Sequence, residues 1–224
     1  STFYGHNSAG VLHLGTSTLI MNGGWLYLSY PPAQFEGANS KIELYSNNGV
    51  QGAWYHPTAV TIGSLEAFHT TYTASLQYVN SAGTVRFHGP AAMYSNFFTA
   101  PTPLHHNVIF EKGASIFNAN NYDALTLTAG QTYVIGQTTP DYPNMDQTIV
   151  SGGSLTALGA GTCAQFITIK SWQYGTPFNL VNNSGTTQTV HCAILEDCHA
   201  TGSDPLEVLD GVNLGNNTGW IFTN

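Results

Sequence analysis

Leu125-Thr126-Leu127-Thr128 alternates an apolar residue with a hydroxyl residue. In an extended strand, neighbouring side chains point to opposite faces, so both leucines fall on one face and both threonines on the other. The segment Phe166-Ile167-Thr168-Ile169-Lys170 repeats the arrangement, with Ile167 and Ile169 on the apolar face. These patterns predict strands that bury one face and leave a threonine-rich face in solvent, as in a β-sandwich or a β-solenoid.

The rest of the chain has the same strand-forming character. Thr, Val, Ile, Tyr, Phe and Trp recur in short runs, and Gly, Asn, Ser and Pro separate them. Turn signals such as Asn22-Gly23-Gly24 and Asn182-Asn183-Ser184-Gly185 mark the separations. We therefore expect an all-β fold with strands at residues 11–14, 18–21, 25–29, 41–45, 75–79, 84–88, 107–111, 124–128, 132–135, 165–170, 177–181, 188–195 and 220–223.

Charged residues are scarce throughout the sequence. The 4 Lys and Arg and the 12 Asp and Glu make up 7% of 224 residues, against about 25% in a typical soluble domain. A sandwich commonly blunts its exposed edges with charge, whereas stacked strands satisfy polar side chains through ladders of Thr and Asn. The low charge therefore favours a right-handed parallel β-helix with irregular rungs, and a β-sandwich or jelly roll is the alternative.

The length fits a single domain at residues 1–224. We expect N-terminal rungs at residues 1–103, and C-terminal rungs with a cap at residues 104–224.

Composition also argues against two classes of partner. The net charge is −8, and the only basic residues are Lys41, Arg86, Lys112 and Lys170, so no basic patch for nucleic acid is expected. No apolar run approaches the ~18 residues of a membrane span, so membrane insertion is not expected.

The cysteines and their neighbours offer zinc-ligand chemistry. His191-Cys192 and Cys198-His199 form a mirrored pair of thiol and imidazole residues. In an extended chain Cys192 and Cys198 would lie about 20 Å apart, whereas a zinc ion needs each sulfur ligand within ~2.3 Å of the metal. A metal site is therefore not expected unless residues 195–197 form a tight turn. Cys163 lies 29 residues before Cys192, about one irregular rung, which leaves open a stacked thiol pair or a disulfide.

Acidic residues are candidate catalytic groups, because glycoside hydrolysis needs two carboxylates at a set separation. The candidates lie in a proline-rich loop, at a strand end and near the C-terminal cap, and few basic residues are available to complement them. We therefore expect no enzyme from the candidates Asp141 with Asp146, Glu196 with Asp197, and Asp204, Glu207 and Asp210. The glycines of Gly159-Ala160-Gly161 precede a strand rather than a helix, so no dinucleotide cofactor is expected.

The closing segment Gly215-Asn216-Asn217-Thr218-Gly219-Trp220 reads as a turn followed by a last strand. Gly215 and Gly219 allow positive φ, and Asn216 and Asn217 tolerate left-handed turns. Trp220 and Phe222 would then cover the end of the core, as a terminal repeat requires. The sequence therefore predicts a structural cap, with sugar stacking on Trp220 as the alternative.

Tyrosine and tryptophan are frequent, and both provide rigid contact area with a polar tip. Such residues suit protein interfaces and sugar faces as well as the core. The candidates for glycan or partner contact are Trp25, Trp54, Tyr55, Trp172 and Tyr174.

Several segments of the second half occur in a recognisable order. Ile167-Thr168-Ile169-Lys170-Ser171 is followed by Gly175-Thr176-Pro177, then by Ala193-Ile194-Leu195-Glu196-Asp197, and last by the Gly-Asn-Asn-Thr-Gly-Trp turn. This order resembles the C-terminal module of β-helical proteins found in phages and among bacterial surface and secreted proteins. The resemblance covers roughly residues 103–224.

The resemblance, with the low charge, implies a non-catalytic structural or adhesive protein. It would be a virion component (phage capsid decoration, fibre or tail-associated) or a bacterial cell-surface module, outside the cell or on the virion surface. Its expected partners are other structural proteins of the same particle or surface, glycans, and further copies of itself in a homo-oligomer. The alternatives are a glycan-binding or polysaccharide-degrading β-helix protein and a self-assembling extracellular filament subunit.

Overall fold

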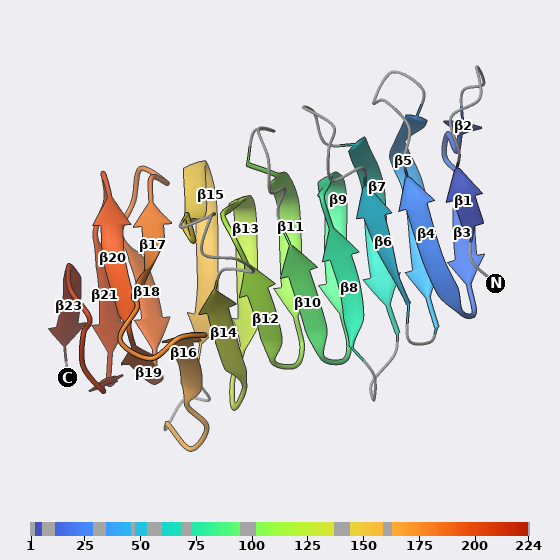
Figure 1. Ribbon diagram of the computed structural model, residues 1–224. Helices are drawn as coiled ribbons and strands as arrows, with labels where there is room; N and C mark the ends of the chain where they lie inside the picture. The colour runs from blue at the N-terminus through green and yellow to red at the C-terminus, as the bar shows by residue number, and fades with distance from the viewer. Residues whose placement is uncertain are drawn as a thin grey trace.

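The computed structural model describes residues 3–5, 12–28, 35–45, 48–52, 60–68, 73–94, 102–136, 144–158 and 163–223. Within these ranges the regular structure is entirely β, as the sequence predicts, and consists of strands β1 to β23. Figure 1 shows the strands stacked side by side along one long axis, with the N-terminus at one end and the C-terminus at the other.

The strands form two long sheets. The first sheet has ten strands in the order β1 (Phe3–Gly5), β4 (Gly24–Leu28), β6 (Asn48–Gly52), β8 (Ala74–Gln77), β10 (Ala91–Tyr94), β12 (Ala114–Phe117), β14 (Thr132–Gly136), β16 (Ile167–Ser171), β19 (Ala193–Glu196) and β22 (Val212–Asn213).

The second sheet has 13 strands. Its main order is β2 (Leu12–His13), β5 (Phe35–Leu44), β7 (Val60–Ala67), β9 (Val79–Phe87), β11 (Leu104–Phe110), β13 (Asn120–Thr128), β15 (Gln147–Leu158), β18 (Gln188–His191), β21 (Leu206–Leu209) and β23 (Trp220–Thr223). Beside this order, β3 (Thr18–Met21) pairs with β5, β17 (Phe178–Asn182) pairs with β15, and β20 (Cys198–Gly202) pairs with β17.

Every pairing among the described strands is parallel. The β-sandwich or jelly roll considered as the alternative is built from antiparallel strands, so the described pairings contradict it. Consecutive strands of the chain also belong mostly to different sheets, as β8 and β9 do. Parallel neighbours therefore come from successive passes of the chain.

Parallel register places equivalent residues above one another in columns. One column of the second sheet runs through Leu44, Ala67, Phe87, Phe110 and Leu127. All five are buried, and the rings of Phe87 and Phe110 stack with centroids 5.4 Å apart. The alternation read from the sequence is confirmed in β13 and β16, where the leucines and isoleucines are buried and the threonines are half-buried.

The apolar faces of the two sheets contribute to one continuous core. A small cavity of about 20 Å³ inside it is lined by Ile116 and Ile135 of the first sheet and Leu125 and Leu155 of the second. Several buried polar groups bond to one another without ions. For example, the buried Gln147 amide donates to the Asn118 carbonyl at 2.7 Å and accepts from the Tyr122 hydroxyl at 2.8 Å.

Candidate functional site

Charged residues concentrate on the outer face of the second sheet, over four adjacent strands. Register places Glu43 of β5 beside Glu66 of β7, and Glu66 beside Arg86 of β9. His88 and Glu111 directly follow β9 and β11. This ionic cluster consists of Lys41, Glu43, Glu66, Arg86, His88 and Glu111.

The ionic cluster is one continuous network of contacts. Lys41 Nζ lies 2.8 Å from a Glu43 oxygen and 3.2 Å from a Glu66 oxygen. His88 joins the two halves, because Nε2 lies 3.1 Å from Glu66 and Nδ1 lies 2.8 Å from Glu111. Arg86 completes the network through a 2.9 Å contact to Glu111. With His88 protonated, three carboxylates face three cations and the cluster is neutral.

The network shifts the pKa values of its members. Burial alone would lower the pKa of His88, but the hydrogen bonds to Glu66 and Glu111 outweigh it and raise that pKa above its usual value. Burial would raise the pKa of Glu66 and of Glu111, but hydrogen bonds from His88 and from Lys41 or Arg86 lower both. The geometry therefore favours a protonated His88 held between two carboxylates.

A polar groove of about 440 Å³ lies along the ionic cluster. Side chains of Ser64 and Thr84 line it together with Lys41, Glu66 and Arg86. Beside the cluster, the ring of Tyr45 stacks on Phe68 at 4.8 Å, and Phe68 stacks on His88 at 5.3 Å.

No local motif predicts the ionic cluster. Its members on neighbouring strands are separated by 20 to 25 positions, as for Glu66 and Arg86 or Arg86 and Glu111. The signal that was available is this recurrence of oppositely charged residues at about the length of one chain pass.

The acidic residues proposed as catalytic candidates are not gathered into one site. Asp146 accepts from the Asn179 amide at 2.7 Å, and Asp204 accepts from the Gly185 backbone at 2.8 Å. Asp197 is buried and accepts from the Gly175 backbone at 2.7 Å and the Asn216 amide at 2.6 Å. These three carboxylates therefore hold turns in place. Of the other candidates, Glu196 ends β19, Glu207 lies in β21, and Asp210 directly follows β21, where its carboxylate lies 3.2 Å from His191 Nε2. Asp141 lies outside the described residues.

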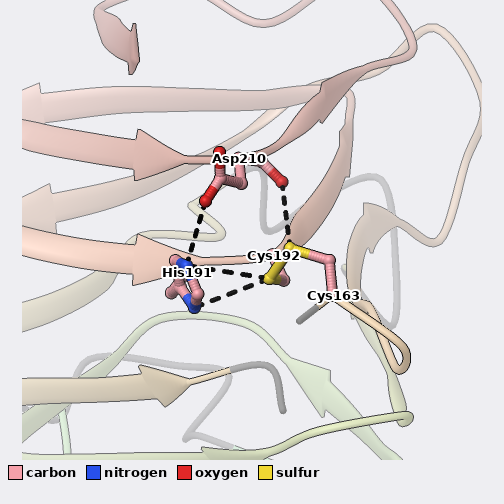
Figure 2. The surroundings of a disulfide bond; sticks show 4 residues. All are labelled: Cys163, His191, Cys192 and Asp210. Carbon is pink, nitrogen blue, oxygen red and sulfur yellow. Dashed lines mark hydrogen bonds and ion pairs between the residues drawn. A yellow bond between two sulfur atoms is a disulfide. The ribbon is translucent and has the colours of Figure 1, made fainter. Parts of the chain in front are cut away.

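Cys163 and Cys192 form a disulfide with Cα atoms 5.1 Å apart. Figure 2 shows the bond beside His191 and Asp210. Cys192 is fully buried directly after β18, and its backbone N–H donates to the Leu209 carbonyl at 2.9 Å. Cys163, Cys192 and Asp210 all have left-handed φ, at 51°, 53° and 52°. The bond therefore ties a turn that follows β15 to the turn between β18 and β19.

The second half of the mirrored pair lies elsewhere. Cys198 begins β20, where it pairs in register with Phe178, and its thiol is free and buried. Burial raises the pKa of this thiol. Neither Cys198 nor His199 belongs to the group of ligand atoms that gathers around Cys163, His191 and Cys192 in the described part of the chain.

The residues of the predicted cap form a hydrogen-bonded turn before β23. Gly215, Asn216 and Gly219 all have positive φ. The Asn217 side chain donates to the Leu195 carbonyl at 2.8 Å and accepts from the Cys198 backbone at 2.8 Å. Trp220 and Phe222 are partly buried against the core, and Trp220 Nε1 donates to the Cys198 carbonyl at 2.9 Å.

The aromatic candidates differ in exposure. Trp172 is 61% exposed and Tyr174 is 86% exposed, so both present their rings to solvent. Trp172 meets Phe117 edge-on at 5.5 Å and continues a stack formed by Phe117 and Tyr94. Trp25 is half-buried and lies against Gly49. Trp54 and Tyr55 lie outside the described residues.

Comparisons with known proteins give no match that would identify a family. No family model matches, and neither do any curated protein or any solved structure. In the described part of the chain, no helix is long and apolar enough to cross a membrane. Function must therefore be argued from the geometry of the chain.

Proposed function

We propose that this chain forms a right-handed parallel β-helix and is a non-catalytic structural or adhesive component of a virion or a bacterial surface. The observation that carries the proposal is the parallel pairing that continues from β1 to β22 in one sheet and from β2 to β23 in the other. Each added pass of the chain extends both sheets and buries further apolar surface, which is the construction of a rigid spacer.

The chemistry of the acidic groups supports a structural role. The three carboxylates of the ionic cluster are in contact with cations or with His88, and Asp146, Asp197 and Asp204 hold turns. Carboxylates engaged in this way stabilise neighbouring strands and are poorly placed to donate protons to a substrate. The proposal extends to a homo-oligomer located outside the cell or on the virion, in contact with structural proteins of the same particle.

The test is the location of the protein and the effect of its removal. Immunogold electron microscopy and mass spectrometry of purified particles and cell envelopes should find the protein on one of these surfaces. Deletion of its gene should alter particle or surface composition or attachment. If the protein were confined to the soluble cell fraction and deletion left particles and attachment unchanged, the proposal would be wrong.

A second function, glycan binding, is favoured by the exposed rings of Trp172 and Tyr174. Both residues lie in the turn that directly follows β16, and exposed aromatic faces suit stacking against sugar rings. A glycan panel should then show binding that Trp172→Ala abolishes, while Tyr45→Ala, which removes an exposed ring beside the ionic cluster, leaves it unchanged. Release of oligosaccharides from a capsular polysaccharide would instead support an enzyme.

A further inference from the structure

The disulfide at the turn after β18 lies beside a histidine, and the two sulfurs and the imidazole are all groups that can bind a metal (Figure 2). In the described part of the chain, the ligand atoms of Cys163, His191 and Cys192 all lie within 4.8 Å of one another. Cys192 Sγ is 3.5 Å from His191 Nδ1 and 3.8 Å from its Nε2. The residues His191-Cys192 thus meet Cys163, whereas Cys198-His199, the other half of the mirrored pair, does not belong to this group.

The distance between Nδ1 and Cys192 Sγ matches what a tetrahedral zinc ion requires, and the two sulfurs would have to move apart. Bonds of ~2.3 Å to sulfur and ~2.0 Å to nitrogen place a sulfur and a nitrogen ligand about 3.6 Å apart, and two sulfurs about 3.8 Å apart. The observed distance from Nδ1 to Cys192 Sγ is 3.5 Å. With the cysteine Cα atoms 5.1 Å apart, side-chain rotation alone can separate the two sulfurs once the bond between them is opened.

Asp210 orients the imidazole for this role. Its Oδ2 lies 3.2 Å from His191 Nε2, the ring nitrogen that is farther from Cys192 Sγ. A carboxylate that accepts the Nε2 proton leaves the Nδ1 lone pair free to bind a metal, which is the arrangement found around metal-bound histidines. The backbone carbonyl of Asp210 also lies 3.7 Å from Cys163 Sγ.

We propose that the reduced protein binds one thiophilic metal ion such as Zn²⁺ through Cys163 Sγ, Cys192 Sγ and His191 Nδ1. A solvent molecule completes the four ligands, and Asp210 positions the imidazole. A dithiol reductant supplies two electrons and two protons to the disulfide and becomes a disulfide itself. Zn²⁺ then displaces one proton from each thiol. The disulfide thus closes this turn in oxidising surroundings, and the metal ion closes the same turn in reducing surroundings.

The experiment compares the full chain in its oxidised and reduced forms. The protein is reduced with dithiothreitol, freed of the reductant without air, and titrated with Zn²⁺ by calorimetry and with Co²⁺ by absorption spectroscopy. The reduced chain should bind one Zn²⁺, and its Co²⁺ form should show a thiolate-to-cobalt charge-transfer band. The oxidised chain should bind neither ion at this site.

Variants identify the ligands. His191→Ala should weaken Zn²⁺ binding at least tenfold, and Asp210→Asn should weaken it by about 10- to 100-fold. Both variants keep the cysteines, so circular dichroism in the oxidised state verifies their fold. His106→Ala is the matched control, because His106 is an exposed histidine that pairs with Asp123 in a different strand. The proposal is overturned if reduced protein binds no Zn²⁺, if His191→Ala binds as tightly as wild type, or if Cys198→Ala abolishes binding.

Discussion

Replacement of Cys163 by serine removes the covalent link between residues 163 and 192 at its more exposed end. The buried Cys192 stays in place, so the substitution opens no cavity in the core. The link closes a loop of 29 residues, and the loss of chain entropy that it imposes on the unfolded state stabilises the fold by about 3.6 kcal/mol. For a chain of this length, the corresponding fall in melting temperature is about 7–14 °C.

Urea unfolding followed by circular dichroism measures this loss. A chelator must be present throughout, so that a metal ion cannot replace the disulfide. Dithiothreitol should lower the midpoint of the wild type to that of Cys163→Ser, and it should leave the variant unchanged, which makes the variant its own control. If the variant lost less than about 1 kcal/mol, or if reductant destabilised both proteins equally, the entropic reasoning would be refuted.

Three further predictions concern the core, the ionic cluster and the last turn. Phe110→Ala should cost about 3–5 kcal/mol in urea unfolding because it empties a stacked column, whereas Ile109→Ala on the outer face should cost far less. Because the pKa of His88 is raised on folding, its stabilisation is complete below its unfolded pKa of about 6.5 and is lost as pH rises through the folded pKa. His88→Gln should therefore destabilise the protein at pH ~6 more than at pH ~8, and equal losses at both would contradict the bridging role. Gly219→Ala should expose β23 to hydrogen exchange because a Cβ there meets the Ala200 carbonyl, while Gly175→Ala, with similar φ and open space, should not.

The strands that the sequence predicted best are bounded by turn residues, with Asn22-Gly23-Gly24 after residue 21 and Gly219 before residue 220. The expected strands at residues 18–21 and 220–223 match β3 and β23 residue for residue. The expected strand at residues 188–195 is divided in two, because Cys192 takes a left-handed φ of 53°. A single residue of positive φ leaves no mark in the hydrophobic pattern, so this division could not be predicted.

Several strands were missed, among them β6, β7, β10, β12, β15, β20 and β21. Two of them show different physical reasons for the miss. β15 spans Gln147–Leu158 and contains Gly152-Gly153, which read as a turn; Gly152 does have positive φ, yet the strand continues through it. The alternation of β7 is interrupted once, because the adjacent residues Ile62 and Gly63 are both buried. In both cases pairing with neighbouring strands overrides the local signal.

The candidate sites also differ in whether local sequence predicts them or whether they depend on pairing between distant segments. The positive φ of the closing turn could be predicted from its glycines and asparagines, because these residue types tolerate the left-handed region of φ. The disulfide between Cys163 and Cys192 could not be decided from the sequence, because the length of each chain pass varies and no spacing rule fixes which residues align. The ionic cluster depends on the same alignment, repeated over four strands.

The parallel order of strands along one axis also determines how the protein would respond to a pulling force. Each strand bonds only to its neighbours in the stack, so tension applied between the two ends loads the hydrogen bonds of one strand at a time and peels the strands off in sequence. The disulfide interrupts this peeling, since the chain between its cysteines, which are 29 positions apart, cannot extend. In a single-molecule pulling experiment, reduction should lengthen the fully extended chain by about 100 Å. A fibre built from such units would draw its tensile strength from side-by-side association of copies rather than from the single chain.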